Sequence, residues 1–192
     1  ILNRPTATVI SSVNAAYARE IQKLFSNQNF RVYTSNDING VQIGGAVKNI
    51  IAIASGLIKG LDFGDNAQGA LVSRGIMEII KLREVYNFKD STLFGLAGLG
   101  DLISTAYSEH SRNRKFGELF AKYRNVDKVK DELNMVSEGL NSCFVINEVI
   151  AKHNLDMPIC KEVYRILFNN YNPEKSLKNL MIRDLKQEEP IK

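Results

Sequence analysis

The sequence predicts a mainly α-helical protein in which a multi-helix domain follows a short β-α-β unit. Two observations support this fold class. Residues 6–35 show a strand pattern, a helix pattern and a second strand pattern, whereas most segments after Val41 place apolar residues at helical spacing. We therefore expect a domain boundary at this change, with residues 1–40 ending one domain and residues 41–192 forming a helical domain.

The β-α-β unit is predicted from three short segments. Residues 6–13 are β-branched and mostly apolar, and residues 30–35 alternate as a half-buried strand does. Between them, residues 14–28 place apolar side chains on one helical face: Ala15, Ala18, Ile21, Leu24 and Phe25. Residues 36–40 have the composition of a turn.

The helical part begins with an apolar helix over residues 44–59. A long amphipathic helix is expected from an N-cap at Asp65 to about Tyr86. Its inward-facing side chains would be Leu71, Ile76, Ile79, Ile80 and Leu82. Asp90 is a candidate cap for a short helix over residues 92–95.

A glycine-rich turn is expected over residues 95–100, and a short helix begins at Asp101. Apolar stripes and cap residues then predict the remaining helices. Their ranges are 112–123, 126–133, 138–153, 158–170 and 173 to about 185.

The composition argues against several classes of function. The 25 Lys and Arg and 21 Asp and Glu residues are interspersed, the net charge is only +4, and the aromatic residues form no stacking surface. We therefore expect no nucleic-acid binding. Cys143 and Cys160 lie in apolar helical patterns, which indicates buried, reduced thiols. The two histidines lack the spacing of metal ligands, so no metal site is expected.

The most apolar run, residues 47–58, is interrupted by Lys48, Asn49, Ser55 and Gly56. An uninterrupted run of about 18 residues is typical of a membrane span. We therefore expect no membrane insertion. We expect a cytoplasmic location, since no leader pattern is visible in a chain that we take to be a fragment.

Lys48 lies in a stretch, residues 41–61, that is otherwise almost uncharged. An unpaired buried ammonium costs several kcal/mol, so Lys48 needs a partner, a ligand or a route to water. It projects from a helix face of small residues, including Gly44, Gly45 and Gly56, where a ligand or a neighbouring backbone can approach. Two interpretations stay open: an acid/base lysine, or tight helix packing with Lys48 reaching the surface.

The segment Gly95-Leu96-Ala97-Gly98-Leu99-Gly100-Asp101 has the order G-x-x-G-x-G and no preceding strand. It is therefore not the dinucleotide-binding fingerprint G-x-G-x-x-G. It places Asp101 at a helix start, where aspartate is a common N-cap. Asp101 could instead pair with Lys48 and orient its ammonium group for acid/base work.

The tetrapeptide Ser111-Arg112-Asn113-Arg114 opens a predicted helix. Free backbone N–H groups, a guanidinium and an amide at a helix start suit a phosphate or a carboxylate. A solvated basic helix start is the alternative. His110 next to it is expected to be a surface turn residue.

Taken together, these motifs resemble those of the bacterial-type NAD(P)-dependent glycerol-3-phosphate dehydrogenases. The resemblance is carried by residues 41–54, 60–67, 95–102 and 111–114, and it continues more loosely to about Ile182 through residues 136–139 and 157–159.

The resemblance implies a helical substrate domain similar to the C-terminal domain of 6-phosphogluconate dehydrogenase, preceded by the end of a Rossmann-type NAD(P)-binding domain. We expect such a fragment to be inactive, or nearly so, when alone.

The resemblance also implies a reaction and its residues. Lys48 corresponds to the general acid/base at the C2 oxygen of the substrate, and Asp101 corresponds to the aspartate that holds this lysine. The residues implied to contact the substrate are Lys48, Asn49, Asp101, Thr105, Ser111, Arg112 and Asn113. Of these, Ser111, Arg112 and Asn113 correspond to the phosphate-binding end.

The cofactor is implied to be NAD or NADP, contacted by Arg112, Val136 and Glu138. The choice between the two is not readable, because the residues that contact the ribose 2′ position are not in this chain. The implied substrates are glycerol 3-phosphate and dihydroxyacetone phosphate, and the implied pathway is the supply of glycerol phosphate for phospholipids. A homodimer is a further expectation.

Two other functions remain open from the residues alone. One is another β-hydroxyacid or 6-phosphogluconate-type dehydrogenase, which would share the lysine but bind a carboxylate or a sugar acid. The other is a non-catalytic helical module for dimerisation or anion binding.

Overall fold

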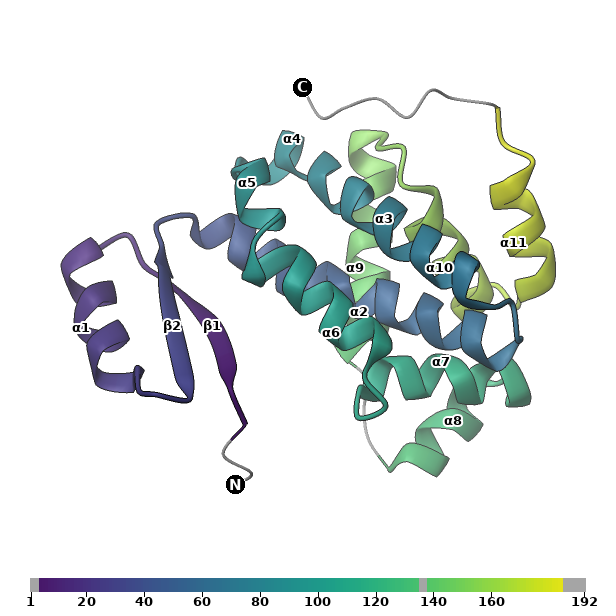
Figure 1. Cartoon of the computed structure of the whole chain (residues 1–192). Coiled ribbons are helices and arrows are strands. Elements are labelled where there is room, and N and C mark those ends of the chain that lie inside the picture. Colours follow the sequence, from purple (N-terminus) through teal and green to yellow (C-terminus); the bar gives the residue numbers. More distant parts are fainter. Residues whose placement is uncertain (1–3, 135–137, 185–192) are drawn as a thin grey trace.

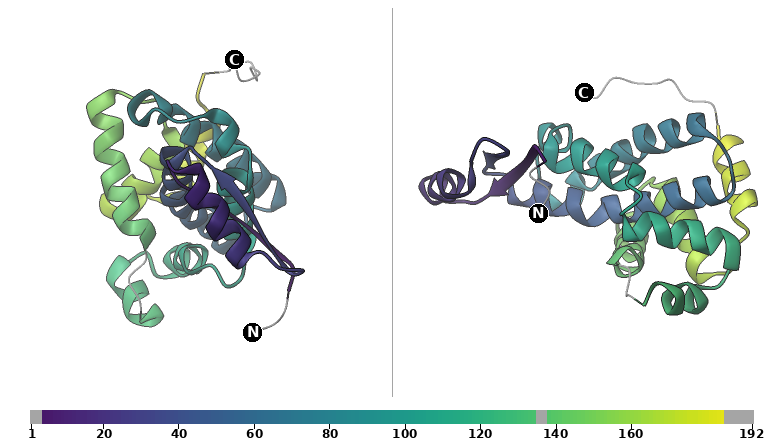
Figure 2. Two further views of the ribbon diagram at one scale, coloured as in Figure 1. Left: turned by 90° about the vertical axis from the view of Figure 1, so that its left-hand side faces the viewer. Right: turned by 60° about the horizontal axis from the view of Figure 1, so that its bottom comes forward.

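The computed structural model describes residues 4–134 and 138–184 of the chain. A β-α-β unit lies at one end of a helical bundle, and the long helix α2 (Ile38–Gly60) leads from this unit into the centre of the bundle (Figure 1). The right-hand view of Figure 2 shows the unit projecting from one end of the bundle, with α11 (Pro173–Met181) at the other. The predicted mainly helical class with a β-α-β start is confirmed.

The β-α-β unit consists of β1 (Thr6–Ser11), α1 (Ala15–Phe25) and β2 (Phe30–Ser35). The two strands pair in parallel, with Thr6 opposite Phe30 at one end of the ladder. A parallel pair needs a crossover connection, and here α1 supplies it.

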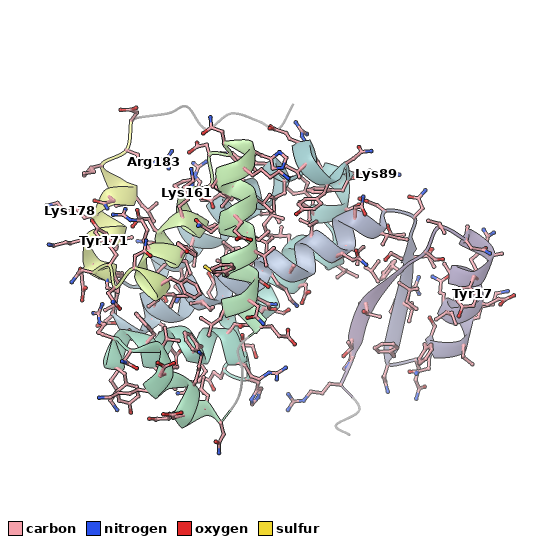
Figure 3. All side chains as sticks on the ribbon, turned by 180° about the vertical axis from the view of Figure 1, so that it is seen from behind. Tyr17, Lys89, Lys161, Tyr171, Lys178 and Arg183 are labelled. Carbon is pink, nitrogen blue, oxygen red and sulfur yellow. The ribbon has the colours of Figure 1, made fainter. Side chains whose placement is uncertain are left out.

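The predicted apolar face of α1 is only partly buried. Ala18 is buried, but Leu24 is 75% exposed and Phe25 is 53% exposed. Tyr17 lies on the outer side of α1, away from the strands (Figure 3). The small sheet described here offers too little surface to cover the helix, which is typical of an isolated pair of strands.

Helix α2 begins six residues before the predicted start at residue 44, within the segment predicted as a turn. Asp37 caps it, since its Oδ1 accepts a hydrogen bond from the Gly40 amide at 3.0 Å. Asp37 Oδ2 accepts further hydrogen bonds from the Lys89 amide at 2.9 Å and from Thr92 Oγ1 at 2.6 Å. Burial alone would raise the pKa of Asp37, but these hydrogen bonds outweigh it and the pKa is lowered.

By length and composition α2 is apolar enough to cross a membrane, which the interrupted run at residues 47–58 did not indicate. An 18-residue window of it has a mean hydropathy of 1.5, and 67% of that window is buried inside the fold. A core helix covered by its neighbours has the same composition, and the neighbours of α2 cover it in this way.

The helices that follow α2 are, in chain order, α3 (Asp65–Lys81), α4 (Arg83–Tyr86), α5 (Asp90–Leu93), the π-helical turn η1 (Leu96–Gly100), α6 (Asp101–Tyr107), α7 (Arg112–Tyr123), α8 (Val126–Leu133), α9 (Glu138–His153), α10 (Pro158–Phe168) and α11. Most of them pack against α2, while α4, α8 and α11 lie on the helices around it (Figure 1). The predicted bounds of α7, α8 and α9 are confirmed.

Several predicted boundaries were wrong. The long helix predicted to reach Tyr86 divides at Leu82 into α3 and α4. Asp65 lies in the first turn of α3, because Gly64, at a φ of 81°, occupies the cap position. Asp90 likewise lies in the first turn of α5 rather than before it. Helices α10 and α11 end two and about four residues earlier than expected.

Helices α2 and α7 cross with their backbones in contact. A Cβ atom on Gly56 would overlap the carbonyl group of Arg114, and one on Gly117 would overlap that of Ile53. This part of the small-residue face of α2 therefore serves helix packing. Closer to Lys48, a Cβ on Gly45 would meet nothing within 4 Å, so the face is open there.

Glu78 on α3 caps α10 across the bundle. Its carboxylate accepts hydrogen bonds from the amides of Ile159 at 2.6 Å and Cys160 at 3.0 Å. Burial raises the pKa of Glu78 to about 7, although these hydrogen bonds act in the opposite direction. Cys143 and Cys160 are free, buried thiols, as expected, and burial raises the pKa of Cys143 to about 12.

Candidate functional site

The centre of the candidate site is an ion pair between α2 and α6. Lys48 Nζ lies 2.5 Å from Asp101 Oδ2. The two side chains keep 20% and 37% of their surface exposed, so the pair lies at the edge of the core and remains open to solvent. Lys48 thus has a charged partner and also a route to water.

The local backbone explains how Asp101 reaches the lysine. The prediction of an N-cap at Asp101 was wrong, because η1 runs into α6 without a break and Asp101 itself is helical, with φ −71° and ψ −34°. Its carboxylate is therefore directed to Lys48. Helix α2 and η1 also approach closely, since a Cβ on Gly44 would lie 2.7 Å from the carbonyl oxygen of Ala97. π-Helical turns are often found at functional sites.

Thr105 lies one turn after Asp101 on α6. Its Oγ1 donates a hydrogen bond to the Asp101 carbonyl oxygen at 2.6 Å and lies 3.4 Å from Asp101 Oδ1. The hydroxyl therefore flanks the carboxylate that holds Lys48.

Asn49 and Asn113 join three helices next to the ion pair. Asn113 Nδ2 on α7 donates to Asn49 Oδ1 on α2 at 3.0 Å, and the Gly139 amide on α9 donates to Asn113 Oδ1 at 3.0 Å. Both asparagines are buried. Because Asn49 follows Lys48 and Asn113 follows Arg112, this link brings the lysine and the start of α7 into one region.

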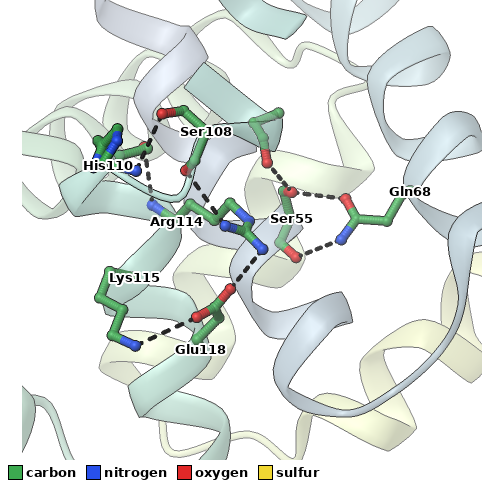
Figure 4. A network of polar contacts seen from close by, with 9 residues as sticks. Ser55, Gln68, Ser108, His110, Arg114, Lys115 and Glu118 are labelled. Atoms are coloured by element: carbon green, nitrogen blue, oxygen red, sulfur yellow. Dashed lines mark hydrogen bonds and ion pairs between the residues drawn. The ribbon is translucent and has the colours of Figure 1, made fainter. Parts of the chain in front are cut away.

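The start of α7 has the features of an anion site. Ser111 caps the helix, since its Oγ accepts from the Arg114 amide at 3.3 Å, and Arg112 is exposed in the first turn. Arg114 has a different position (Figure 4). Its guanidinium donates to the Ser108 carbonyl oxygen at 3.3 Å and pairs with Glu118 at 2.8 Å. Of the two arginines in the motif, Arg112 is therefore the one directed to solvent.

Of the residues expected to meet the cofactor, Arg112 lies at the start of α7 and Glu138 at the start of α9. Glu138 is the first residue of α9 and is exposed, and the next residue, Gly139, is the one bonded to Asn113. Val136 lies outside the described residues. His110 is exposed, as expected of a surface turn. In the part of the chain that the structure describes, no three His, Cys, Asp or Glu side chains gather as metal ligands.

A second buried polar group lies two turns along α2 from Lys48. Ser55 Oγ donates to Gln68 Oε1 at 2.7 Å and to the Ala106 carbonyl oxygen at 2.6 Å, while Gln68 Nε2 donates to the Ser55 carbonyl oxygen at 3.0 Å (Figure 4). Nothing in the sequence pattern singled out Gln68. The available signal was its position on the inward face of α3, three residues before Leu71.

Comparisons with known proteins point to one family. Residues 37–178 match the family model described as NAD-dependent glycerol-3-phosphate dehydrogenase C-terminus. A glycerol-3-phosphate dehydrogenase [NAD(P)+] of Clostridium botulinum is 44% identical over 188 residues, which are 98% of this chain and 57% of the relative. That of Clostridium acetobutylicum is 45% identical over 184 residues, which are 96% of this chain and 55% of the relative.

Among solved structures, glycerol-3-phosphate dehydrogenase from Coxiella burnetii superposes with a TM-score of 0.90 at 37% identity, covering 94% of this chain and 56% of that one. The enzyme from Plasmodium falciparum superposes with a TM-score of 0.89 at 25% identity, covering 97% of this chain and 54% of that one. The chain thus spans a little over half the length of the relatives it matches. It belongs to the NAD-dependent glycerol-3-phosphate dehydrogenase family and contains that family's C-terminal domain.

Proposed function

We propose that the complete protein containing this chain interconverts dihydroxyacetone phosphate and sn-glycerol 3-phosphate with NAD(P)H. The observation that carries this proposal is the 2.5 Å pair of Lys48 and Asp101, which the Asn49–Asn113 hydrogen bond joins to the start of α7. A partly exposed ammonium near a helix start with an exposed arginine suits a small substrate with a reacting oxygen at one end and a phosphate at the other.

In this proposal Lys48 is the general acid/base. During reduction it donates a proton to the C2 oxygen of dihydroxyacetone phosphate, and during oxidation it removes the proton of the C2 hydroxyl group. Asp101 accepts a hydrogen bond from Lys48 Nζ and thereby holds the lysine side chain in one orientation. Proton transfer of this kind contributes roughly 10²–10⁴-fold to a rate.

The phosphate of the substrate would lie at the start of α7. Arg112 is exposed there and offers a planar guanidinium that can donate two hydrogen bonds to a phosphate. The N-terminal amides of this 12-residue helix and Ser111 add further donors. We assign Asn49, Thr105 and Asn113 to the walls between the phosphate and the lysine, because the Asn49–Asn113 hydrogen bond joins the two ends of the site and Thr105 flanks Asp101.

NAD or NADP would supply or accept the hydride at C2. We propose that Arg112, Glu138 and Val136 contact it, and two observations on the described residues support this. Arg112 and Glu138 are exposed charged groups at the starts of α7 and α9. The Gly139–Asn113 hydrogen bond holds these two helix starts together. The dehydrogenase names of the relatives include NAD(P)+.

We also propose that residues 1–40 are the end of the nucleotide-binding domain and residues 41–192 are the substrate domain. The parallel β1–α1–β2 unit supports this, because nucleotide-binding domains are built from such units. The boundary then lies in the first turn of α2, so this helix would connect the two domains rigidly.

A homodimer is proposed on the basis of an apolar patch on α9 and α10. Phe144, Tyr164 and Phe168 form an aromatic cluster, with 4.9 Å between the ring centroids of Tyr164 and Phe168. Phe144 and Val145 are about half exposed. Exposed apolar side chains that form one contiguous patch are typical of interfaces. Sedimentation of the complete protein and of its Phe144→Glu variant would test this, and a monomeric wild type would contradict it.

The test of the proposed function is the loss of reduced-nicotinamide absorbance when dihydroxyacetone phosphate is added to the complete protein. We expect turnover in the wild type and at least about 100-fold less in Lys48→Ala, with an unchanged circular dichroism spectrum. Lys59→Ala is the matched control, because Lys59 is an exposed lysine on the same helix. A wild type inactive with both cofactors would overturn the reaction, and an active Lys48→Ala would overturn the acid/base role.

A further inference from the structure

We propose that Ser55 and Gln68 are positioning residues for this reaction: they hold the carboxyl-terminal end of α6 on α2, so that Asp101 at the other end meets Lys48. This inference rests on the proposed function. The acid/base proposal assigns no role to either residue, and their hydrogen bonds do not include Lys48 or Asp101.

Helix α6 is attached to α2 at both of its ends. At its start Asp101 pairs with Lys48, and near its end the Ala106 carbonyl oxygen lies 2.6 Å from Ser55 Oγ. Lys48 and Ser55 are two helical turns apart, about 10 Å along α2, so these are separate attachments. Because the two contacts occur in the same order along both helices, α6 runs in the same direction as α2, and Figure 1 shows it lying against α2.

The contact at Ala106 satisfies a group that the helix itself leaves open. Ala106 is in the last turn of α6, where carbonyl groups have no intrahelical partner. Ala106 and Ser55 are both fully buried, so solvent does not replace the hydroxyl donor. Ser55 therefore acts on α6 as a cap supplied by another helix.

Gln68 on α3 fixes the position of the Ser55 hydroxyl group. The Gln68 amide accepts from Ser55 Oγ at 2.7 Å and donates to the Ser55 carbonyl oxygen at 3.0 Å, and Gln68 is itself buried. A serine hydroxyl has one proton, so Gln68 and Ala106 share it. This small network ties α3, α2 and α6 at one point.

Losing this attachment would let α6 shift along α2 at its far end. The Arg114 hydrogen bond to the Ser108 carbonyl would still hold the following turn, so we expect a small displacement rather than unfolding. A displacement of about 1 Å can cost up to about 100-fold in rate when it moves a catalytic group. The phosphate end would move less, because it lies on α7.

The experiment uses the complete protein and three variants. Ser55→Ala removes the hydroxyl proton that Gln68 and Ala106 share. In Ser55→Ala/Gln68→Met the Gln68 amide is also absent, so the double variant does not bury an amide that has lost the Ser55 hydroxyl. Ser176→Ala is the matched control: this serine on α11 is also buried, and among the described residues its hydroxyl has no hydrogen-bond partner. The readouts are kcat, KM for dihydroxyacetone phosphate, and hydrogen exchange of the α6 amides.

For Ser55→Ala and the double variant we expect kcat to fall about tenfold, KM to stay unchanged, and exchange to rise in α6 but not in α8. Ser176→Ala should match the wild type. A wild-type kcat in Ser55→Ala, or recovery of kcat in the double variant, would overturn the inference. An inactive wild type would overturn the proposed function instead. In that case hydrogen exchange alone tests the positioning role. Unchanged exchange of the α6 amides in Ser55→Ala would overturn it.

Discussion

Lys48 and Asp101, 53 positions apart in the sequence, form a 2.5 Å ion pair that connects the middle of α2 to the first residue of α6. The pair is neither fully buried nor fully solvated, with 20% and 37% of the two side chains exposed. A lysine in this setting is held in one orientation while its ammonium group remains accessible to a substrate.

Replacing Asp101 by asparagine should lower kcat about 10–100-fold in the complete protein, because the lysine loses the charge that holds and orients it. The fold should survive, since the pair lies at the edge of the core. Steady-state kinetics and circular dichroism of the purified variant would check this. The control is Asp156→Asn, which removes a carboxylate from exposed ion pairs with Lys81 and Arg183. Equal loss of activity in both variants would argue against a special role for Asp101.

Replacing Arg112 by alanine should raise the KM for dihydroxyacetone phosphate about 10–100-fold and change kcat less, because a guanidinium–phosphate contact contributes mainly to binding. Arg112→Lys should be intermediate, since lysine keeps the charge but not the two-pronged geometry. Lys115→Ala serves as the control, because Lys115 is an exposed cation one turn further along α7. An unchanged KM in Arg112→Ala would exclude the phosphate role.

Replacing Gly56 by alanine should destabilise the protein by about 2–3 kcal/mol, because the added Cβ would overlap the backbone of α7 at Arg114. Gly69→Ala is the matched control, since a Cβ there meets nothing within 4 Å and alanine favours a helix by about 1 kcal/mol. Denaturant unfolding of both variants would measure the difference. Equal stability of the two variants would show that α2 and α7 can move apart without a loss of folding stability.

The stability of the fold should depend on pH through Glu78. Burial raises the pKa of Glu78 from 4.5 to about 7, so the folded state holds this proton more tightly than the unfolded state. The contribution of Glu78 to the free energy of unfolding is therefore full below about pH 4.5. It falls as the pH rises to about 7, by roughly 3 kcal/mol, and is level above that.

The variant Glu78→Gln should lack this fall, because glutamine does not titrate. Lys81, which lowers the pKa of Glu78, and Cys160, whose amide and thiol face the carboxylate, stay unchanged in the variant. Denaturant unfolding of the complete protein across this pH range would check the prediction, with the exposed Glu84→Gln as control. If Glu78→Gln keeps the wild-type slope, another group causes the pH dependence.

Local signals in the sequence were enough to predict several elements to the residue. Ser111 and Asn125 cap α7 and α8 with their own side chains, by accepting hydrogen bonds from the amides of Arg114 and Lys128. Such caps act within a few residues, so they are readable from the chain alone. The apolar faces of α3 and α7 followed from helical periodicity in the same way.

One element that was predicted wrongly depends on distant partners. The start of α2 is set by Asp37, whose carboxylate is held by Lys89 and Thr92 more than 50 positions away. The glycine-rich segment, a π-helical turn in the structure, packs against Gly44 of α2, about 50 positions earlier in the sequence. No window of sequence contains both sides of these contacts.

By itself, the sequence determined the helical class, the bounds of α7, α8 and α9, and the types of residue that the site requires. It required a partner, a ligand or a route to water for Lys48, because burying an unpaired ammonium costs several kcal/mol. Only the tertiary structure decided which residues meet: Lys48 with Asp101, Asn49 with Asn113, and Ser55 with both Gln68 and Ala106. The physical reason is that hydrogen bonds and ion pairs need separations of about 3 Å between atoms, and only the packing of whole helices against one another sets distances of that size.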